Sequence, residues 1–245
     1  MSLNNMMDEP TPPEGEIQST RSRVPWTTRD VWVGLALFLA WLLVSLGFGI
    51  AREAYAWEFD FGLFLALWEL MLIIPTWLLT IRKYKLPWRS LGLRKFDLTT
   101  VAVGCGLMIF SFIFNFFYNL VLLFKGIHSP FEIEGLFHTA ASPWLIFLTG
   151  IIIAPLVEEI FFRGFLYTGL REKYGWMTAA LISAGLFAVV HLQPITIPPI
   201  FLMGLIFAYL YQRTESIWPA VIMHFATNTL GLAAAYAVSQ LDFLS

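Results

Sequence analysis

The stretch "APLVEEIFFRGFLY", residues 154–167, has the composition of a membrane helix but carries three ionisable side chains. Glu158, Glu159 and Arg163 lie within six residues of one another in an otherwise apolar run. An ionisable group at membrane depth costs about 2.5–3.5 kcal/mol on insertion scales, so such groups usually face a cavity or a charged partner. The stretch therefore predicts a membrane-spanning helix that carries a functional site.

The chain as a whole is far more apolar than a soluble domain. Of its 245 residues, 58% are hydrophobic and 13% are charged, whereas about a quarter of a soluble domain is charged. Several apolar runs are long enough to cross about 30 Å of hydrocarbon. We therefore expect an all-α, polytopic transmembrane helical bundle. The net charge of −2 gives no indication of nucleic-acid binding, and the single cysteine excludes a disulfide within the chain.

Seven apolar segments divide the chain into predicted spans. They cover residues 31–51, 61–81, 98–124, 144–170, 176–192, 199–212 and 217–237. The polar, proline-rich residues 1–25 predict a disordered cytoplasmic tail before a membrane domain over residues 26–245. An eighth, half-inserted segment would change only the last part of this topology, so the expected number of spans is seven or eight.

The basic residues predict how these spans are oriented. Twelve of the fifteen Lys and Arg residues lie in the tail and in every second connection, and the alternate connections hold only Arg52 and Lys125. Because basic loops stay in the cytoplasm, the N-terminus is expected there. The protein is thus expected to be an integral membrane protein in contact with the lipid bilayer.

Helical spacing assigns the three charges of the opening stretch to different faces. Glu159 and Arg163 are four residues apart, so they share a face and can form an ion pair. Glu158 is turned by about 100° from Glu159, because a helix has 3.6 residues per turn. We therefore expect Arg163 to hold Glu159 in place while Glu158 stays available on the neighbouring face.

Depth estimates bring further polar side chains to the level of Glu158. His191 lies near the end of the fifth predicted span, and His224 and Asn228 share one face of the last. Counting about 1.5 Å per residue from the cytoplasmic turns places all three in the same layer as Glu158. Glu69 in the second span has no evident partner, and an interhelical hydrogen bond or a position near the outer cavity is favoured over catalysis for it.

This set of side chains allows two ways of activating water. Glu158 can act as a general base on a water molecule. Alternatively, Glu158, His191 and His224 can bind Zn²⁺, which itself activates a bound water. His224 and Asn228 could then stabilise the oxyanion of a tetrahedral intermediate. The set favours hydrolysis of a peptide bond inside the membrane, and a proton-coupled transporter or a non-catalytic membrane scaffold are the alternatives.

Three short motifs resemble those of the CPBP family of intramembrane proteases, which includes type II CAAX prenyl endopeptidases and bacteriocin-immunity proteins. "EEIFFR" (158–163) matches the EExxxR motif, "FAVVH" (187–191) the FxxxH motif, and "HFATN" (224–228) the third motif. They occur in this order on three predicted spans. The resemblance covers a core at about residues 144–236 and a short lead-in segment at 90–95.

The resemblance implies a role for each matched residue. Glu158 would activate water, and the Glu159–Arg163 pair would support it. The site would be completed by His191, His224 and Asn228. Family members are described both as metalloproteases and as metal-independent glutamate peptidases, so a zinc ion stays open. The implied substrates are membrane-anchored: a CAAX-type prenylated protein, or a bacterial peptide or lipoprotein processed at a prokaryotic plasma membrane.

Overall fold

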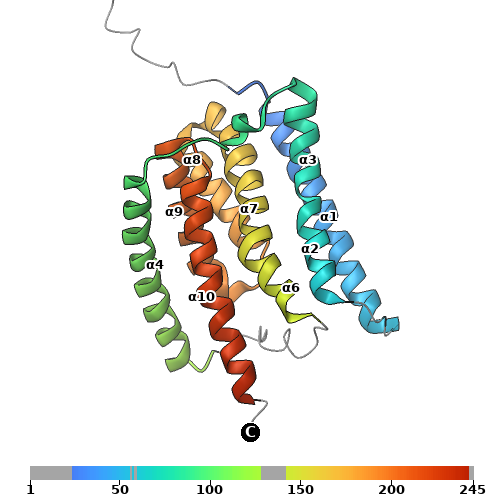
Figure 1. Cartoon of the computed structure of the whole chain (residues 1–245), viewed down its shortest axis with the longest axis vertical. Helices are drawn as coiled ribbons and strands as arrows, with labels where there is room; N and C mark the ends of the chain where they lie inside the picture. The colour runs from blue at the N-terminus through green and yellow to red at the C-terminus, as the bar shows by residue number, and fades with distance from the viewer. Residues whose placement is uncertain (1–23, 56, 58–59, 128–141, 243–245) are drawn as a thin grey trace, which may run out of the picture.

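The computed structural model of the chain describes residues 24–55, 57, 60–127 and 142–242. Nearly all of the predicted disordered tail lies outside the described residues. Within these ranges every regular element is a helix, which confirms the all-α class (Figure 1). The α-helices within these ranges are α1 (Thr28–Tyr55), α2 (Phe61–Met71), α3 (Ile73–Trp77), α4 (Thr99–Phe124), α6 (Pro143–Leu148), α7 (Ala154–Glu159), α8 (Thr168–Val189), α9 (Ile197–Thr214) and α10 (Trp218–Asp242).

Six helical stretches of the described chain are long and apolar enough to cross a membrane. One of them, Pro143–Val189, has 47 residues and would be about 70 Å long if it were straight. It is interrupted at Gly175, whose backbone has φ 78° and ψ 165°, far from helical values. The stretch is therefore two antiparallel helices rather than one.

Contacts across the Gly175 turn show that the chain folds back on itself. The Ser183 hydroxyl donates a hydrogen bond to the backbone carbonyl of Phe162 at 3.1 Å, across 21 residues of sequence. The Phe187 ring packs edge-on against the Phe162 ring, with 5.1 Å between their centroids. With this reversal the described chain makes seven passes, in agreement with the predicted topology.

The basic connections gather at one end of the bundle. Glu215, in the turn after α9, contacts Arg94 at 3.2 Å and Arg171 at 3.5 Å, and so joins three connections that are far apart in sequence. This end is uppermost in Figure 1, and α10 ends at the opposite side. The arrangement agrees with the predicted alternation of basic and non-basic connections.

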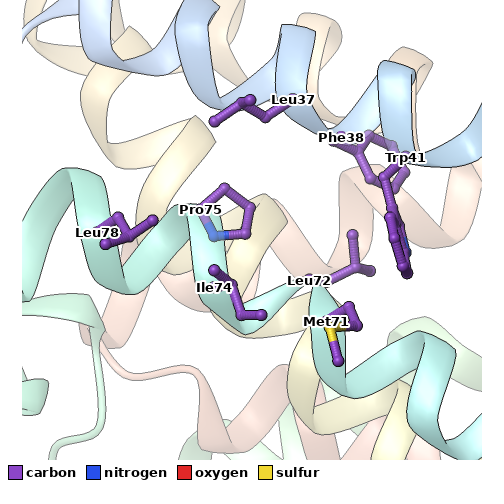
Figure 2. A pocket seen from close by; sticks show the side chains of 8 residues that line it. All are labelled: Leu37, Phe38, Trp41, Met71, Leu72, Ile74, Pro75 and Leu78. Atoms are coloured by element: carbon purple, nitrogen blue, oxygen red, sulfur yellow. The ribbon is translucent and has the colours of Figure 1, made fainter.

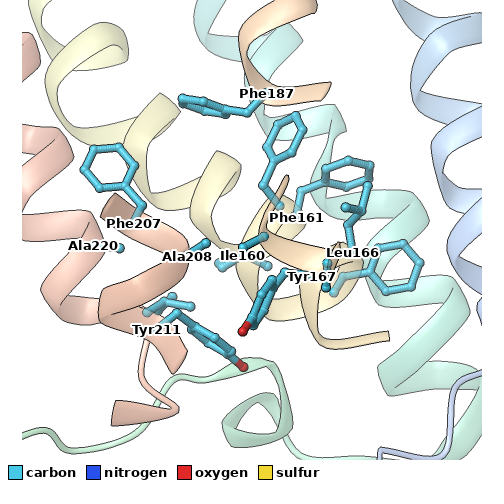
Figure 3. Packing of buried hydrophobic residues seen from close by; sticks show 14 of the residues in the cluster. Ile160, Phe161, Leu166, Tyr167, Phe187, Phe207, Ala208, Tyr211 and Ala220 are labelled. Carbon is cyan, nitrogen blue, oxygen red and sulfur yellow. The ribbon is translucent and has the colours of Figure 1, made fainter. Parts of the chain in front are cut away.

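The opening stretch forms the centre of the bundle. Its second half is the π-helical segment η5 (Ile160–Tyr167), in which every residue is buried. Side chains from η5, α8 and α9 meet in the core shown in Figure 3. The short 3-10 helix η3 (Trp88–Leu91) lies against η5 at Gly164, where a Cβ atom would collide with the backbone carbonyl of Leu91. A helix so completely enclosed can hold charged groups away from lipid.

We expect Gly175→Ala to lower the thermal unfolding midpoint in detergent. An alanine is strained at this φ and ψ, at a cost of about 1–3 kcal/mol, while its Cβ would meet no atom within 4 Å. Gly185→Ala is the matched control, because Gly185 is helical and its nearest neighbour would be 4.0 Å away. If Gly175→Ala and Gly185→Ala had the same unfolding midpoint, Gly175 would not adopt the strained backbone conformation described for the turn.

Candidate active site

Pro155 shapes the helix that carries the predicted site. α7 is preceded by the π-helical segment η4 (Thr149–Ile153) and followed by η5. Proline has no N–H to donate to the carbonyl four residues earlier, so the turn before it departs from the α-helical pattern. π-helical turns within α-helices often mark functional sites. Glu158 and Glu159 thus end a short α-helical stretch between two wider ones.

Glu159 and Arg163 form the predicted ion pair. The Arg163 Nη1 atom donates to Glu159 Oε1 at 2.8 Å, and both side chains are completely buried. Arg163 Nη2 donates to the backbone carbonyl of Gly204 in α9 at 3.1 Å. The guanidinium also lies over the rings of Phe187 and Phe207, at 4.5 and 5.2 Å from their centroids. These contacts replace the water that a buried charge loses.

His224 lies between the two neighbouring carboxylates. Its Nδ1 is 3.2 Å from Glu159 Oε1, and its Nε2 is 3.7 Å from Glu158 Oε2. A carboxylate only accepts hydrogen bonds, so Nδ1 carries the proton in the shorter contact. The longer distance, between Nε2 and Glu158 Oε2, exceeds that of a hydrogen bond. The sequence predicted that the carboxylates face different ways but not that one imidazole reaches both.

The two adjacent glutamates differ in accessibility. The Glu159 side chain is fully buried, whereas 15% of the Glu158 side chain is exposed. The Oε2 atom of Glu158 has no hydrogen-bond partner among the described residues. Glu158 is thus the more accessible of the two carboxylates, although the Oε2 atoms of both are buried and without a hydrogen-bond partner among the described residues.

The structure places His191 and Asn228 at the edge of this cluster. α8 ends at Val189, so His191 lies beyond the last helical residue and is exposed, where the sequence predicted it inside a span. Its Nδ1 is 2.6 Å from the Phe187 carbonyl, to which it donates. Asn228 Nδ2 donates to the Gly150 carbonyl at 2.7 Å. Gly150 precedes Glu158 by eight residues, roughly 12 Å along the helix.

A zinc site needs three protein ligands that converge on one point. Among the residues that the structure describes, no group of three His, Cys, Asp or Glu side chains is arranged to hold a metal ion. Nδ1 of His224 is bound to Glu159 and Nδ1 of His191 to the Phe187 carbonyl, which leaves Nε2 of each ring as the available ligand atom. Glu158, His191 and His224 do not converge on one metal position in this arrangement, so they do not fit a zinc ion as placed.

Sequence reasoning missed the groups that enclose Arg163. Gly204 supplies a backbone carbonyl, and its own Cβ position is blocked by Ala184, so α8 and α9 approach closely there. Phe207 stacks on His224 with 5.1 Å between ring centroids. Phe207 belongs to no recognised motif, and it lies one helical turn after Met203 in an apolar run without any polar signal. Only the packing of α9 against α10 reveals its contact with the site.

An apolar pocket lies between α1 and the α2–α3 segment, away from these polar groups (Figure 2). Leu37, Phe38 and Trp41 of α1 face Met71 and Leu72 on the other side. The pocket volume is about 230 Å³. No ionisable side chain lines it, so it supplies no group for acid–base chemistry.

Comparison with known proteins finds a family model that covers the part of the chain holding the site. Residues 140–230 match the family model described as "Type II CAAX prenyl endopeptidase Rce1-like". All six predicted site residues fall within the matched segment. No solved structure matches the chain.

Three curated relatives share part of the chain. The "Putative membrane peptidase YdiL" of Bacillus subtilis (strain 168) is 37% identical over 89 residues, which is 36% of either chain. An "Uncharacterized 24.3 kDa protein" of Escherichia coli is 35% identical over 123 residues, 46% of this chain and 57% of the relative. Protein YxdF of Lactococcus lactis subsp. lactis (strain IL1403) is 26% identical over 162 residues, 64% of this chain and 89% of the relative.

The chain thus spans about a third of the length of YdiL and just over half of that of the Escherichia coli relative. The six apolar helices make it an integral membrane protein. The family model and the three motifs coincide on the helices that build the cluster around Glu158. Over residues 140–230 the chain is similar to the Rce1-like type II CAAX prenyl endopeptidase model, which supports the resemblance to the CPBP family of membrane proteases.

Proposed function

We propose that the protein is an intramembrane endopeptidase in which Glu158 activates the attacking water. The observation that carries this proposal is the contrast between two adjacent glutamates. Glu159 is fully buried and its Oε1 is bound to Arg163 and His224, whereas 15% of the Glu158 side chain is exposed. A general base needs a carboxylate that water and substrate can reach.

In the proposed reaction, Glu158 takes a proton from water while the water oxygen attacks the carbonyl carbon of the scissile peptide bond. A tetrahedral intermediate forms, and its oxyanion needs a hydrogen-bond donor. The proton then moves to the amide nitrogen, directly from Glu158 or through Nε2 of His224, and the C–N bond breaks. No atom is left over, because the water is divided between the new carboxyl group and the new amine.

His224 has a second role in this scheme. With Nδ1 bound to Glu159, its Nε2 can accept a proton from Glu158. The resulting imidazolium is stabilised by the Glu159 carboxylate and can donate to the oxyanion or to the leaving nitrogen. Arg163 and Glu159 then act through His224 by holding its ring in one orientation. The half-buried Asn228, one helical turn further along α10, retains a second amide hydrogen for the oxyanion.

The substrate class follows from the family and from the location of the site. The description of the matched model suggests a prenylated CAAX-type protein, and a bacterial membrane peptide or lipoprotein is the second candidate. In either case the scissile bond has to reach Glu158 from the membrane. We further propose a prokaryotic plasma membrane as the location, with the N-terminus and the basic end of the bundle in the cytoplasm.

We expect Glu158→Gln to reduce cleavage of a membrane-anchored peptide by about 10²- to 10⁴-fold, because glutamine cannot take a proton from water. The measurement is cleavage by purified protein in detergent or liposomes. Glu172→Gln is the matched control, since Glu172 is an exposed carboxylate near the Gly175 turn. Undiminished cleavage by Glu158→Gln would refute the mechanism. Proton-coupled flux without any proteolysis would favour a transporter, and the absence of both activities a scaffold or immunity protein.

Arg163→Met should destabilise the fold by about 3–5 kcal/mol, because it leaves the Glu159 carboxylate buried without its partner. Adding Glu159→Gln removes that charge and should restore part of the unfolding midpoint without restoring cleavage. Thermal unfolding and peptide cleavage are measured on the same samples. If the single and double variants unfold at the same temperature, the ion pair does not carry the stability assigned to it.

We expect proteolysis to continue in the presence of a metal chelator. The potential ligands Glu158, His191 and His224 are not arranged as a metal site, and Glu158 alone can activate water in the proposed scheme. The test compares cleavage before and after dialysis against 1,10-phenanthroline, with elemental analysis of the purified protein. Loss of cleavage that added Zn²⁺ restores would show that a metal takes part and that the site rearranges to bind it.

A further inference from the structure

Glu69 is an ionisable residue of α2 that lies within a membrane-spanning stretch and outside the segment matched by the family model. Its Oε2 atom is buried and has no hydrogen-bond partner among the described residues. The interhelical hydrogen bond expected for it from the sequence is therefore not made by this oxygen. A buried carboxyl oxygen without a hydrogen-bond donor inside a membrane span costs free energy, so a functional reason for its presence is sought.

Small residues on one face of α2 bring Glu69 close to the catalytic helix. Gly62 and Ala66 are the buried residues of α2, and Glu69 follows them on the same face at helical spacing. At Gly62 a Cβ atom would be 2.7 Å from Cβ of Leu145, so the backbones of α2 and α6 approach closely. α2 also packs against η4 and α7.

This packing places Glu69 and Glu158 on two helices that contact each other, within range of electrostatic interaction. Each has a buried Oε2 atom without a hydrogen-bond partner in the described part of the chain. Two buried acceptor atoms without a partner thus lie on the neighbouring helices α2 and α7.

A purely structural role does not account for Glu69. Like charges at short range inside a membrane oppose folding, and a glutamine or leucine of similar size would avoid this cost. Strain of this kind persists mainly at functional sites. Arg163 and His224 could supply a positive charge in the site, but both bind Glu159, so neither neutralises Glu69 directly.

We propose that Glu69 is a further catalytic residue, which accepts a hydrogen bond from the water that Glu158 activates. Water has two O–H groups: one donates to Glu158, which takes that proton, and the other donates to Glu69. With both hydrogens held, a lone pair of the water oxygen is directed at the substrate carbonyl. Glu69 undergoes no change in bonding during the step. This inference rests on the proposed peptidase function.

The first test measures kcat and KM for a membrane-anchored peptide. Glu69→Leu should lower kcat roughly 10- to 100-fold, the value of one hydrogen bond to a charged group, with KM changed by less than about twofold. Glu69→Gln keeps an acceptor oxygen and should lose less. Thr76→Val is the matched control, because Thr76 is a buried residue of α3 whose hydroxyl has no partner among the described residues.

The second test does not depend on activity. Removing one charge of a repelling pair should raise the unfolding midpoint, so Glu69→Gln should stabilise the parent chain. The gain should disappear in a Glu158→Gln background, where the repulsion is already absent. A lower midpoint in both backgrounds would mean that Glu69 has a structural role and would overturn the inference.

The outcomes separate this inference from the proposed function. If the parent cleaves, Glu158→Gln does not, and Glu69→Leu keeps the parental kcat, then the role of Glu69 is wrong and the peptidase mechanism stands. An increase of KM with unchanged kcat would likewise overturn it, by making Glu69 a substrate-binding group. A parent that cleaves no membrane-anchored peptide overturns the proposed function, and the inference fails with it.

Discussion

The buried ion pair between Glu159 and Arg163 is the interaction on which the rest of the site depends. A charge inside a membrane protein is tolerated when hydrogen bonds and a countercharge compensate for the water that it loses. Arg163 obtains these from three directions: the Glu159 carboxylate, the Gly204 carbonyl and two phenylalanine rings. These groups come from α7, α8 and α9, so all of the contacts of Arg163 form only when these helices have assembled.

The same pair determines what its neighbours can do. Because Glu159 is held by Arg163, its Oε1 can also bind Nδ1 of His224 and so set the tautomer of that ring. Nε2 is then turned toward Glu158. One residue type at two successive positions thereby acquires two properties, a fixed buried carboxylate and an accessible one. Environment rather than composition separates the two roles, as in other sites built on paired carboxylates.

Much of this arrangement was predictable from residue spacing. The four-residue spacing of Glu159 and Arg163 indicated the ion pair. A glycine after the basic "REKY" segment fits the turn that divides the 47-residue stretch. These inferences needed only helical geometry over one or two turns. They succeed because neighbours at this range are held together by the helix itself.

The positions of His191 and Asn228 were harder to predict, because depth counting assumes a straight helix with a constant rise. α8 ends two residues before His191, and η4 and η5 are π-helical, so register and rise change on both sides of α7. The bridging of two carboxylates by His224 depends on how α10 packs against α7. Such tertiary contacts leave no periodic signal in the sequence.

The helices before residue 140 have a part in the site although the family model does not extend to them. Phe38 of α1 packs against Phe161 and Phe162 of η5, and α2 packs against η4 and α7. These contacts cover faces of the catalytic helix that would otherwise meet lipid tails, which cannot hydrate a carboxylate. A membrane peptidase must keep water beside its base while admitting a substrate from the bilayer. In the role that we propose for it, Glu69 of the covering helix α2 serves the first requirement, because a carboxyl group adds a polar wall where an apolar one would exclude water.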